Sequence, residues 1–533
     1  QIRKVQPLVF VVAKGQAHAE SFSYRFDPNR LYQLAYTGTL SSRVLVEAGV
    51  GATISHWHQF RMPYVTEDHV MVRDYGTGQA WGARETYIGH PNDSDRFTQR
   101  ASVSYVTGTH SAKFGIHVEQ GVLNTWTEGQ SHDTSYVFIF GTPIQVNQFA
   151  TPYLLQGRFT ETGIYAQDQW IIDRLTLNIG VRMDLFNGSV PAQSIAATGS
   201  GWIPARSFDK VSGVPAWKDI NPRLGMAYDL SGDGRTALKV SLGRYVRKTG
   251  VDIANEVNPI TTSVNQVGRG WYDANTNYVP DCDLGNFGAN GECGAIRNKN
   301  FGQNNPNATR WSQDVLDGWG VRDNNWDFSA EVQQELAEGL SVTAGYYFNN
   351  GGYYYGDSNV RVTDNLAIGP DDFDAYCVTA PVDSRLPGGG GNEICGLYDI
   401  KPGKFGLVEN LVTKTSNYGT DTRRNDFFNV SWDARFRNGA QFGGGIDTGR
   451  SLKDRCMTVN SPEQQNFFRG VGWGVAPIQF CNVKRGFAAQ TQLKMFGSLP
   501  LPLDFAVSGT FQNLSGPEVL ANWAVPNSSI IPS

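Results

Sequence analysis

The stretch that decides the fold is "GIYAQDQWIIDRLTLNIGVRMDLF", residues 163–186, in which apolar and polar side chains alternate on both sides of Asp173-Arg174. After this pair, the odd positions from Leu175 to Leu185 are all apolar, whereas the even positions include Arg182 and Asp184. Successive side chains of a β-strand point to opposite faces of the sheet, so this pattern predicts a hairpin with one apolar and one polar face.

The same alternation recurs in "LSVTAGYYF" (340–348), "FNVSWDARF" (428–436) and "DFAVSGTFQ" (504–512). Short turns are predicted at 40–43, 108–110, 173–174, 232–235, 337–339, 438–439 and 500–503. Long connections are predicted at about 59–95, 124–156, 188–220, 247–325, 349–424 and 450–484. Alternation of short and long connections is typical of outer-membrane β-barrels, which have short periplasmic turns and long outer loops.

The composition agrees with an all-β membrane protein. Glycine (60 residues) and aromatic residues (12%) are abundant, and no window approaches the roughly 18 consecutive apolar residues of a membrane-spanning helix. We therefore predict a large antiparallel up-and-down transmembrane β-barrel of about fourteen strands. Its lumen would be too wide for wall side chains to fill. A soluble β-sandwich with half-buried strands is the alternative.

A wet lumen explains the polar strand faces, because charged side chains there would contact water while the apolar faces contact lipid. The charged residues expected to point into the lumen are Arg182, Asp184, Lys239, Asp433 and Arg435. The formal net charge is −5 and no basic run is present, so the sequence predicts no nucleic-acid partner.

Six cysteines occur as three local pairs within segments rich in Gly, Asn and Asp: Cys282 with Cys293, Cys377 with Cys395, and Cys456 with Cys481. An even number in such segments predicts disulfides that staple loops in an oxidising compartment. Six unrelated thiols are the alternative.

A family resemblance lies in two stretches of the chain, "GIYAQDQWIIDRLTLNIGVRMD" (163–184) and "NPRLGMAYDLSGDGRTALKVSLGRYV" (221–246). They resemble the C-terminal barrel of TonB-dependent outer-membrane receptors, in particular the Oar-like branch. Further likeness lies in "WYDANTNYVPDCDL" (271–284), "DDFDAYCVTAPVDSRLPGGGGNEICGLYDI" (371–400) and "SGTFQNLSGPEVLANW" (508–523). Together these stretches cover most of the chain from about residue 90 onward.

The resemblance implies a 22-stranded barrel in the outer membrane of a Gram-negative bacterium, closed by an N-terminal plug and coupled to TonB. We find no plug, TonB box or carboxypeptidase-regulatory-like domain in residues 1–533, so we expect this sequence to be the barrel segment of a longer receptor. TonB-driven transport is therefore implied by the family resemblance and not by residues of this sequence.

Oxygen ligands of the kind that calcium prefers gather in "DANTNYVPDCD". The candidate ligands are Asp273, Asn275, Asn277, Asp281 and Asp283. This segment lacks the glycine and the final acidic residue of a helix-loop-helix calcium loop, because Tyr278 and Leu284 occupy those positions. A solvated turn rich in Asp and Asn is the alternative interpretation.

Other motifs are weaker. His56 and His58 in "SHWHQF" would share one strand face and form half of a transition-metal site, but the sequence does not identify a third ligand; ordinary wall histidines are the alternative. The glycine-rich "LPGGGGNE" (386–393) lacks the Lys-Ser/Thr of a phosphate loop. We find no nucleophile elbow and no pair of acid/base carboxylates, so we do not expect an enzyme.

The sequence thus leads to a TonB-dependent receptor that imports a siderophore, glycan or peptide captured by its extracellular loops. Outer-membrane lipid and, through the family, the TonB complex are its expected partners. A structural or adhesive surface barrel without transport is the alternative.

Overall fold

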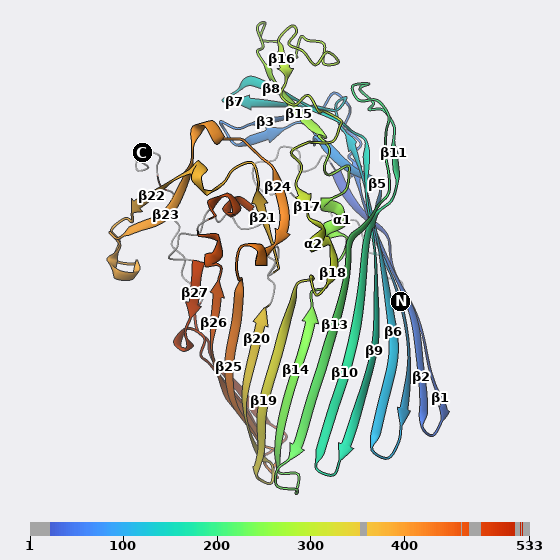
Figure 1. Ribbon diagram of the computed structural model, residues 1–533, viewed down its shortest axis with the longest axis vertical. Coiled ribbons are helices and arrows are strands. Elements are labelled where there is room, and N and C mark those ends of the chain that lie inside the picture. Colours follow the sequence, from blue (N-terminus) through green and yellow to red (C-terminus); the bar gives the residue numbers. More distant parts are fainter. Residues whose placement is uncertain are drawn as a thin grey trace.

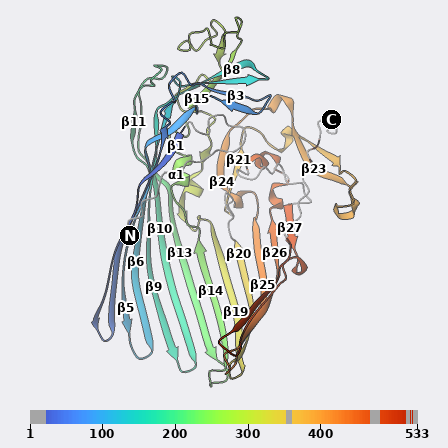
Figure 2. The same cartoon turned by 180° about the vertical axis from the view of Figure 1, so that it is seen from behind.

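A computed structural model of the chain describes residues 22–351, 360–459, 461–467, 481–516, 523 and 525. Its main feature is a curved antiparallel sheet that forms a barrel wall (Figures 1 and 2). In the described residues, fourteen strands follow one another along this wall in chain order. They are β1 (Phe22–Ser41), β2 (Val44–Arg61), β5 (Thr86–Val106), β6 (His110–Gly129), β9 (Tyr153–Ile172), β10 (Leu175–Val190), β13 (Val211–Asp229), β14 (Thr236–Val246), β19 (Asn324–Ala337), β20 (Leu340–Gly351), β25 (Thr422–Arg435), β26 (Gln441–Asp454), β28 (Gln492–Pro500) and β29 (Ala506–Asn513).

The up-and-down barrel topology predicted from the sequence is therefore confirmed. Within the described part of the chain, β1 and β29 do not pair with each other, so these fourteen strands form an open arc. The 22 strands that the family resemblance implies stay a prediction.

The hairpin of residues 163–186 shows why these sequences form the wall. Ile172 pairs with Leu175, which leaves Asp173 and Arg174 as a two-residue turn. Asp173 has a φ of 51°, a left-handed conformation that aspartate tolerates better than most residues. All seven predicted short turns separate consecutive wall strands.

The apolar strand faces form a continuous exposed surface on the outside of the wall. Ile179 is 50% exposed and pairs with Leu224, which in turn pairs with Leu242. Other large apolar side chains exposed on this face are Val50, Phe114, Ile116, Ile164, Val181, Val332, Val430, Ile446 and Met495. An exposed apolar band of this kind is the lipid-facing surface of a transmembrane barrel.

The wall strands run further than the alternation of apolar residues indicated. Ser189 pairs with Ser212 and Val190 with Val211, so residues 188–190 and 211–220 of the predicted connection belong to wall strands. A strand needs only about 9–11 residues to cross a bilayer, and the 19 residues of β13 therefore extend well beyond it.

Three long connections join in a second sheet beyond one end of the wall, with strand order β16-β15-β8-β7-β3-β4 (Figure 1). We call this sheet the loop layer. Its strands are β3 (Met71–Asp74), β4 (Gln79–Trp81), β7 (Thr134–Ile139), β8 (Thr142–Phe149), β15 (Gln266–Trp271) and β16 (Cys293–Ile296).

The remaining strands and α-helices of the connections are short. They are β11 (Gln193–Ile195), β12 (Arg206–Phe208), α1 (Asp252–Glu256), β17 (Arg310–Trp311), α2 (Gln313–Leu316), β18 (Asp317–Trp319), β21 (Arg361–Asn365), β22 (Phe373–Thr379), β23 (Glu393–Ile400), β24 (Asn410–Lys414) and β27 (Asn482–Arg485). Among the residues described, no helix has the length and apolar character needed to cross a membrane.

The connection between β14 and β19, residues 247–323, folds back against the inner face of the wall. Its α1 and α2 pack on a hydrophobic cluster centred on Phe159, Phe186 and Trp217 of β9, β10 and β13. Its β18 pairs in parallel with β13 at Ala216 to Lys218. We call this segment the inward connection, because it covers part of the lumen face of the wall.

Candidate functional site

A cavity of about 230 Å³ lies on the lumen face of the wall, next to the inward connection. Its lining is rich in charged side chains from five wall strands and from both ends of the connection. The lining residues are His117, Glu161, Arg182, Asp184, Asn221, Arg223, Arg244, Tyr245, Val246, Lys248 and Arg322. Alternation along β6, β9, β10 and β13 places the polar groups that these strands contribute opposite the lipid face.

One half of the lining contains Asp184, Asn221 and Arg244, which form a hydrogen-bonded chain that continues to Asp219. The Asp184 carboxylate accepts hydrogen bonds from Arg182 Nε (2.7 Å) and from Asn221 Nδ2 (2.7 Å). Arg244 donates to Asn221 Oδ1 (2.8 Å) and to Asp219 Oδ1 (2.9 Å). Asp184, Asn221 and Asp219 are each less than 5% exposed. A buried carboxylate is costly without a partner, so Asp184 depends on Arg182 and Asp219 depends on Arg244.

The other half ties the inward connection to the wall. Arg322 is 1% exposed, and its Nη1 lies 2.8 Å from Glu161 Oε1. Lys248 Nζ bridges two wall carboxylates, Glu119 at 2.5 Å and Glu161 at 3.0 Å. The Arg322 guanidinium also lies over the Phe186 ring at 5.2 Å. The connection is thus held by ion pairs as well as by apolar contacts.

Arg223 differs from the other cations of the cavity. Its guanidinium lies over the Tyr245 ring at 4.9 Å, and it contacts no carboxylate among the described residues. It is exposed on the lumen face. The chemistry of this position is that of a cationic group available to an anion in the lumen.

Only part of the cavity was predictable from the sequence. Five charged residues were expected to face the lumen. Of these, Arg182 and Asp184 line the cavity, whereas Lys239 hydrogen-bonds to Gln333 elsewhere on the wall. Asp433 and Arg435 pair with each other near the turn end of β25, where both are exposed. Strand alternation could have added Glu161, but the sequence carried no signal that Lys248 and Arg322 would fold onto it.

The first three candidate calcium ligands form tight turns. Both Asp273 oxygens accept backbone N–H groups, from Asn277 (3.2 Å) and Tyr278 (3.0 Å). Asn275 Oδ1 accepts the N–H of Asn277, and Asn277 Oδ1 accepts the N–H of Val279. Side-chain oxygens that accept from the following backbone are typical of Asx turns.

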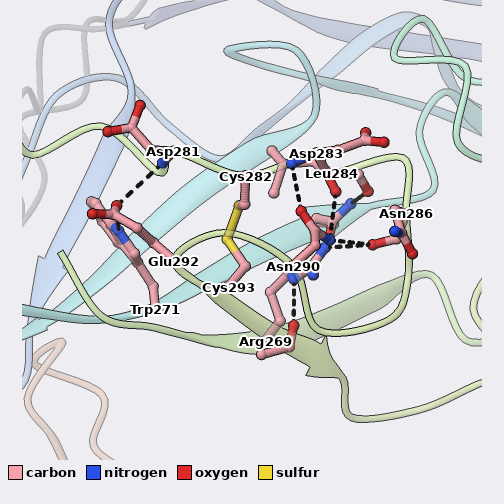
Figure 3. The surroundings of a disulfide bond; sticks show 12 residues. Arg269, Trp271, Asp281, Cys282, Asp283, Leu284, Asn286, Asn290, Glu292 and Cys293 are labelled. Carbon is pink, nitrogen blue, oxygen red and sulfur yellow. Dashed lines mark hydrogen bonds between the residues drawn. A yellow bond between two sulfur atoms is a disulfide. The ribbon is translucent and has the colours of Figure 1, made fainter. Parts of the chain in front are cut away.

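The last two candidate ligands lie on opposite sides of the Cys282–Cys293 disulfide (Figure 3). Asp281 Oδ2 accepts from the side-chain amides of Asn275 and Asn277, at 2.6 and 3.0 Å. Asp283 Oδ1 accepts from the N–H of Gly285. These hydrogen bonds are those of a turn rich in Asp and Asn, and calcium binding by the five residues stays a prediction.

The structure contains three disulfides, each between the sequence neighbours that were expected to pair. Cys282–Cys293 closes the hairpin beside β16, Cys377–Cys395 joins β22 to β23, and Cys456–Cys481 follows β26. All three lie in the long connections, outside the membrane-facing part of the wall. A buried arginine, Arg269, supports the first hairpin by donating to the carbonyls of Gly294, Asn286 and Gly288.

The loop layer is fastened by Asp74 at the end of β3. Its carboxylate accepts backbone N–H groups from its own turn, Gly76 (2.8 Å) and Thr77 (3.0 Å), and from the β7–β8 turn, Phe140 (3.0 Å) and Gly141 (2.7 Å). Burial alone would raise the pKa of Asp74, but the four N–H groups outweigh burial and lower the pKa below its ordinary value.

We expect the loop layer to loosen in acid because of Asp74. The hydrogen bonds to its ionised carboxylate contribute fully above the ordinary pKa of 3.8 and are lost as pH falls through the lowered folded pKa. Asp74→Asn should expose the amides of Phe140 and Gly141 already at pH 7 and remove this pH dependence, as measured by hydrogen exchange corrected for intrinsic rates. Asp68→Asn, an exposed change in the same connection, should behave as wild type. Equal protection in Asp74→Asn and wild type would contradict the assignment.

Comparison with known proteins gives a family match for most of the chain. A family model described as "Outer membrane beta barrel domain" matches residues 14–442. No curated protein sequence matches the chain. Similar solved structures include the outer membrane transporter YddB from Escherichia coli (12% identity, TM-score 0.48, 92% of this chain and 50% of that chain), the copper transporter OprC (10%, 0.42, 92% and 52%) and the siderophore receptor PiuA from Acinetobacter baumannii (10%, 0.42, 91% and 54%). The chain spans about half the length of these proteins.

Proposed function

The chain belongs to the outer membrane beta barrel domain family and lies in the bacterial outer membrane. We propose that it is the barrel portion of a TonB-dependent receptor of the Oar-like branch. In this proposal the receptor imports a siderophore, glycan or peptide. The plug and the TonB box would belong to other parts of the longer protein.

One observation carries the proposal: a charged lumen cavity lies next to an inward-folded connection that also contributes to the outer loop layer. The inward connection supplies Lys248 and Arg322 to the cavity and β15 and β16 to the loop layer. A substrate captured outside would therefore contact the same segment that covers part of the lumen. A barrel that serves only as an adhesive platform has no need for such a connection between its surface and its lumen.

The charges of the cavity favour substrates with an anionic group. Lys248, Arg244 and Arg322 are neutralised by wall carboxylates, but Arg223 faces the lumen without one in the described structure. A hydrogen bond to a charged group contributes about 1.5–3 kcal/mol, and each 1.4 kcal/mol is a factor of about ten in affinity. Arg223 would thus improve uptake of an anionic substrate by about ten- to a hundredfold.

The experiment is uptake of labelled probes by cells that carry the intact receptor. The probes are ferric siderophores, acidic oligosaccharides and acidic peptides, with and without a protonophore. We expect at least one probe to enter in an energy-dependent manner, with Arg223→Gln lowering its uptake about tenfold or more. Arg437→Gln changes an exposed arginine of a short turn that pairs with Glu338, and it should leave uptake unchanged.

The alternative, a structural or adhesive surface barrel, predicts a different result. No probe would then enter faster than in cells that lack the protein, while cell–cell or cell–surface adhesion would depend on it. Energy-independent uptake would contradict the TonB-dependent part of the proposal and leave a passive channel.

A further inference from the structure

Three of the eight histidines of the chain gather with two aspartates where β2 and β5 run beside each other. His56 and His58 come from β2, and His90, Asp93 and Asp95 come from β5. This cluster lies apart from the lumen cavity, and the proposed transport mechanism does not use it.

Backbone geometry brings these side chains together. His56 and His58 are two residues apart in a strand, so they share one face, the same face as Val46 and Val50. Asp93 is the direct cross-strand partner of His56. A register irregularity between Ile88 and Asn92 of β5 lets His90 reach the same group from the neighbouring strand.

The candidate ligand atoms are spaced as ligands of one small cation. One atom each of His56, His58 and Asp93 lies within 4.8 Å of the others. His58 Nε2 and His90 Nδ1 are 3.0 Å apart, and His56 Nδ1 is 3.6 Å from Asp93 Oδ1. Two ligands at about 2.1 Å from a tetrahedral zinc ion lie roughly 3.4 Å from each other. These two spacings are close to this value. His90 Nδ1 also lies 3.4 Å from His58 Nδ1 and is outside the group of three ligand atoms, so the His90 ring would turn to reach the ion.

Neighbouring groups hold two of the ligands so that His56 Nδ1 and Asp93 Oδ1 face each other. Asp95 Oδ2 lies 3.2 Å from His56 Nε2 and accepts a hydrogen bond from it. This contact orients the ring so that Nδ1 points toward Asp93. Asn124 Nδ2 donates to Asp93 Oδ2 at 3.2 Å. Asp93 Oδ1 is buried without a hydrogen-bond donor in the described part of the chain. When His56 Nδ1 carries no proton, its lone pair and this carboxylate oxygen face each other, and a cation between them would relieve the repulsion.

We propose that His56, His58, His90 and Asp93 bind a divalent transition-metal ion of the zinc class. Imidazole nitrogen and carboxylate oxygen in a four-ligand set are the donors that zinc prefers. Asp95 and Asn124 act as positioning residues, because each holds a ligand through the atom that does not face the site. The ion would join β2 to the irregular part of β5, on the outer face of the wall beyond the apolar band.

The test uses the intact protein in detergent, without a histidine tag, with zinc chloride added to one sample and cobalt(II) chloride to another. After dialysis, we expect about one zinc per chain by elemental analysis, and cobalt(II) should give the strong visible absorption of a tetrahedral site. His58→Gln and Asp93→Asn should each weaken zinc binding by more than about 100-fold, and Asn124→Ala by about 10- to 100-fold.

A matched control separates this site from ordinary histidines. His110 also pairs with an aspartate, Asp168 at 2.6 Å, but without further histidines, so His110→Gln should leave zinc binding unchanged. Electrophoretic mobility of unheated samples shows that each variant still forms the barrel. The proposal is overturned if wild type retains no more zinc than folded His58→Gln, or if His110→Gln loses zinc to the same extent.

Discussion

Replacement of Trp217 by alanine is expected to release the inward connection from the wall at a cost of about 3–5 kcal/mol. Trp217 is 2% exposed, and its indole Nε1 donates to the Val315 carbonyl at 2.9 Å. Its ring packs 5.9 Å from Phe186, within the cluster that receives α1 and α2. Truncation removes this packing and leaves the Val315 carbonyl without its donor. Limited proteolysis within residues 247–323 reports the release.

The matched control is Trp319, a tryptophan of the inward connection itself that is 57% exposed. Trp319→Ala removes a comparable side chain from β18 without opening the cluster, and surface changes of this kind usually alter stability by less than about 0.5 kcal/mol. Cleavage of Trp217→Ala at the wild-type rate would show that the apolar cluster does not hold the connection. Release of the connection should also change uptake if it controls access to the lumen.

The wall was predictable from the sequence because its determinants are local. The faces of residues 175–185 follow from alternation alone, and Asp173-Arg174 lies where two alternating runs meet. Strand ends were not predictable in this way. Beyond the bilayer the two faces of a strand no longer contact lipid and water respectively, so alternation fades while backbone pairing continues to Val190 and Val211.

The loop layer and the candidate sites depend on contacts between distant parts of the chain. β3 pairs with β7, about 60 residues later, through short segments that carry no distinctive pattern. Alternation placed Arg182 and Asp184 in the lumen, but their surroundings depend on how residues 247–323 fold back. The pair His56 and His58 was recognisable, whereas His90 and Asp93 join it only through the register and the irregularity of β5.

The second large effect is expected at Arg244, which is 8% exposed and donates to the buried carboxylate of Asp219. Arg244→Met would leave Asp219, 1% exposed, without its cation, and breaking a buried ion pair in this way costs about 3–5 kcal/mol. Urea unfolding in detergent or in vesicles measures the loss. The double variant Arg244→Met/Asp219→Asn should recover much of it, because no unpaired charge remains.

The same wall contains an exposed counterpart that serves as the control. Arg435 and Asp433 pair at 3.2 Å with side chains 72% and 44% exposed, and such surface pairs contribute about 0–1 kcal/mol. Arg435→Met should therefore be nearly neutral. If both single arginine variants lose the same stability, the lumen around Arg244 is as well solvated as the turn end of the wall. The structure requires the opposite, because Arg244, Asn221, Asp184 and Asp219 form one buried chain whose members depend on each other.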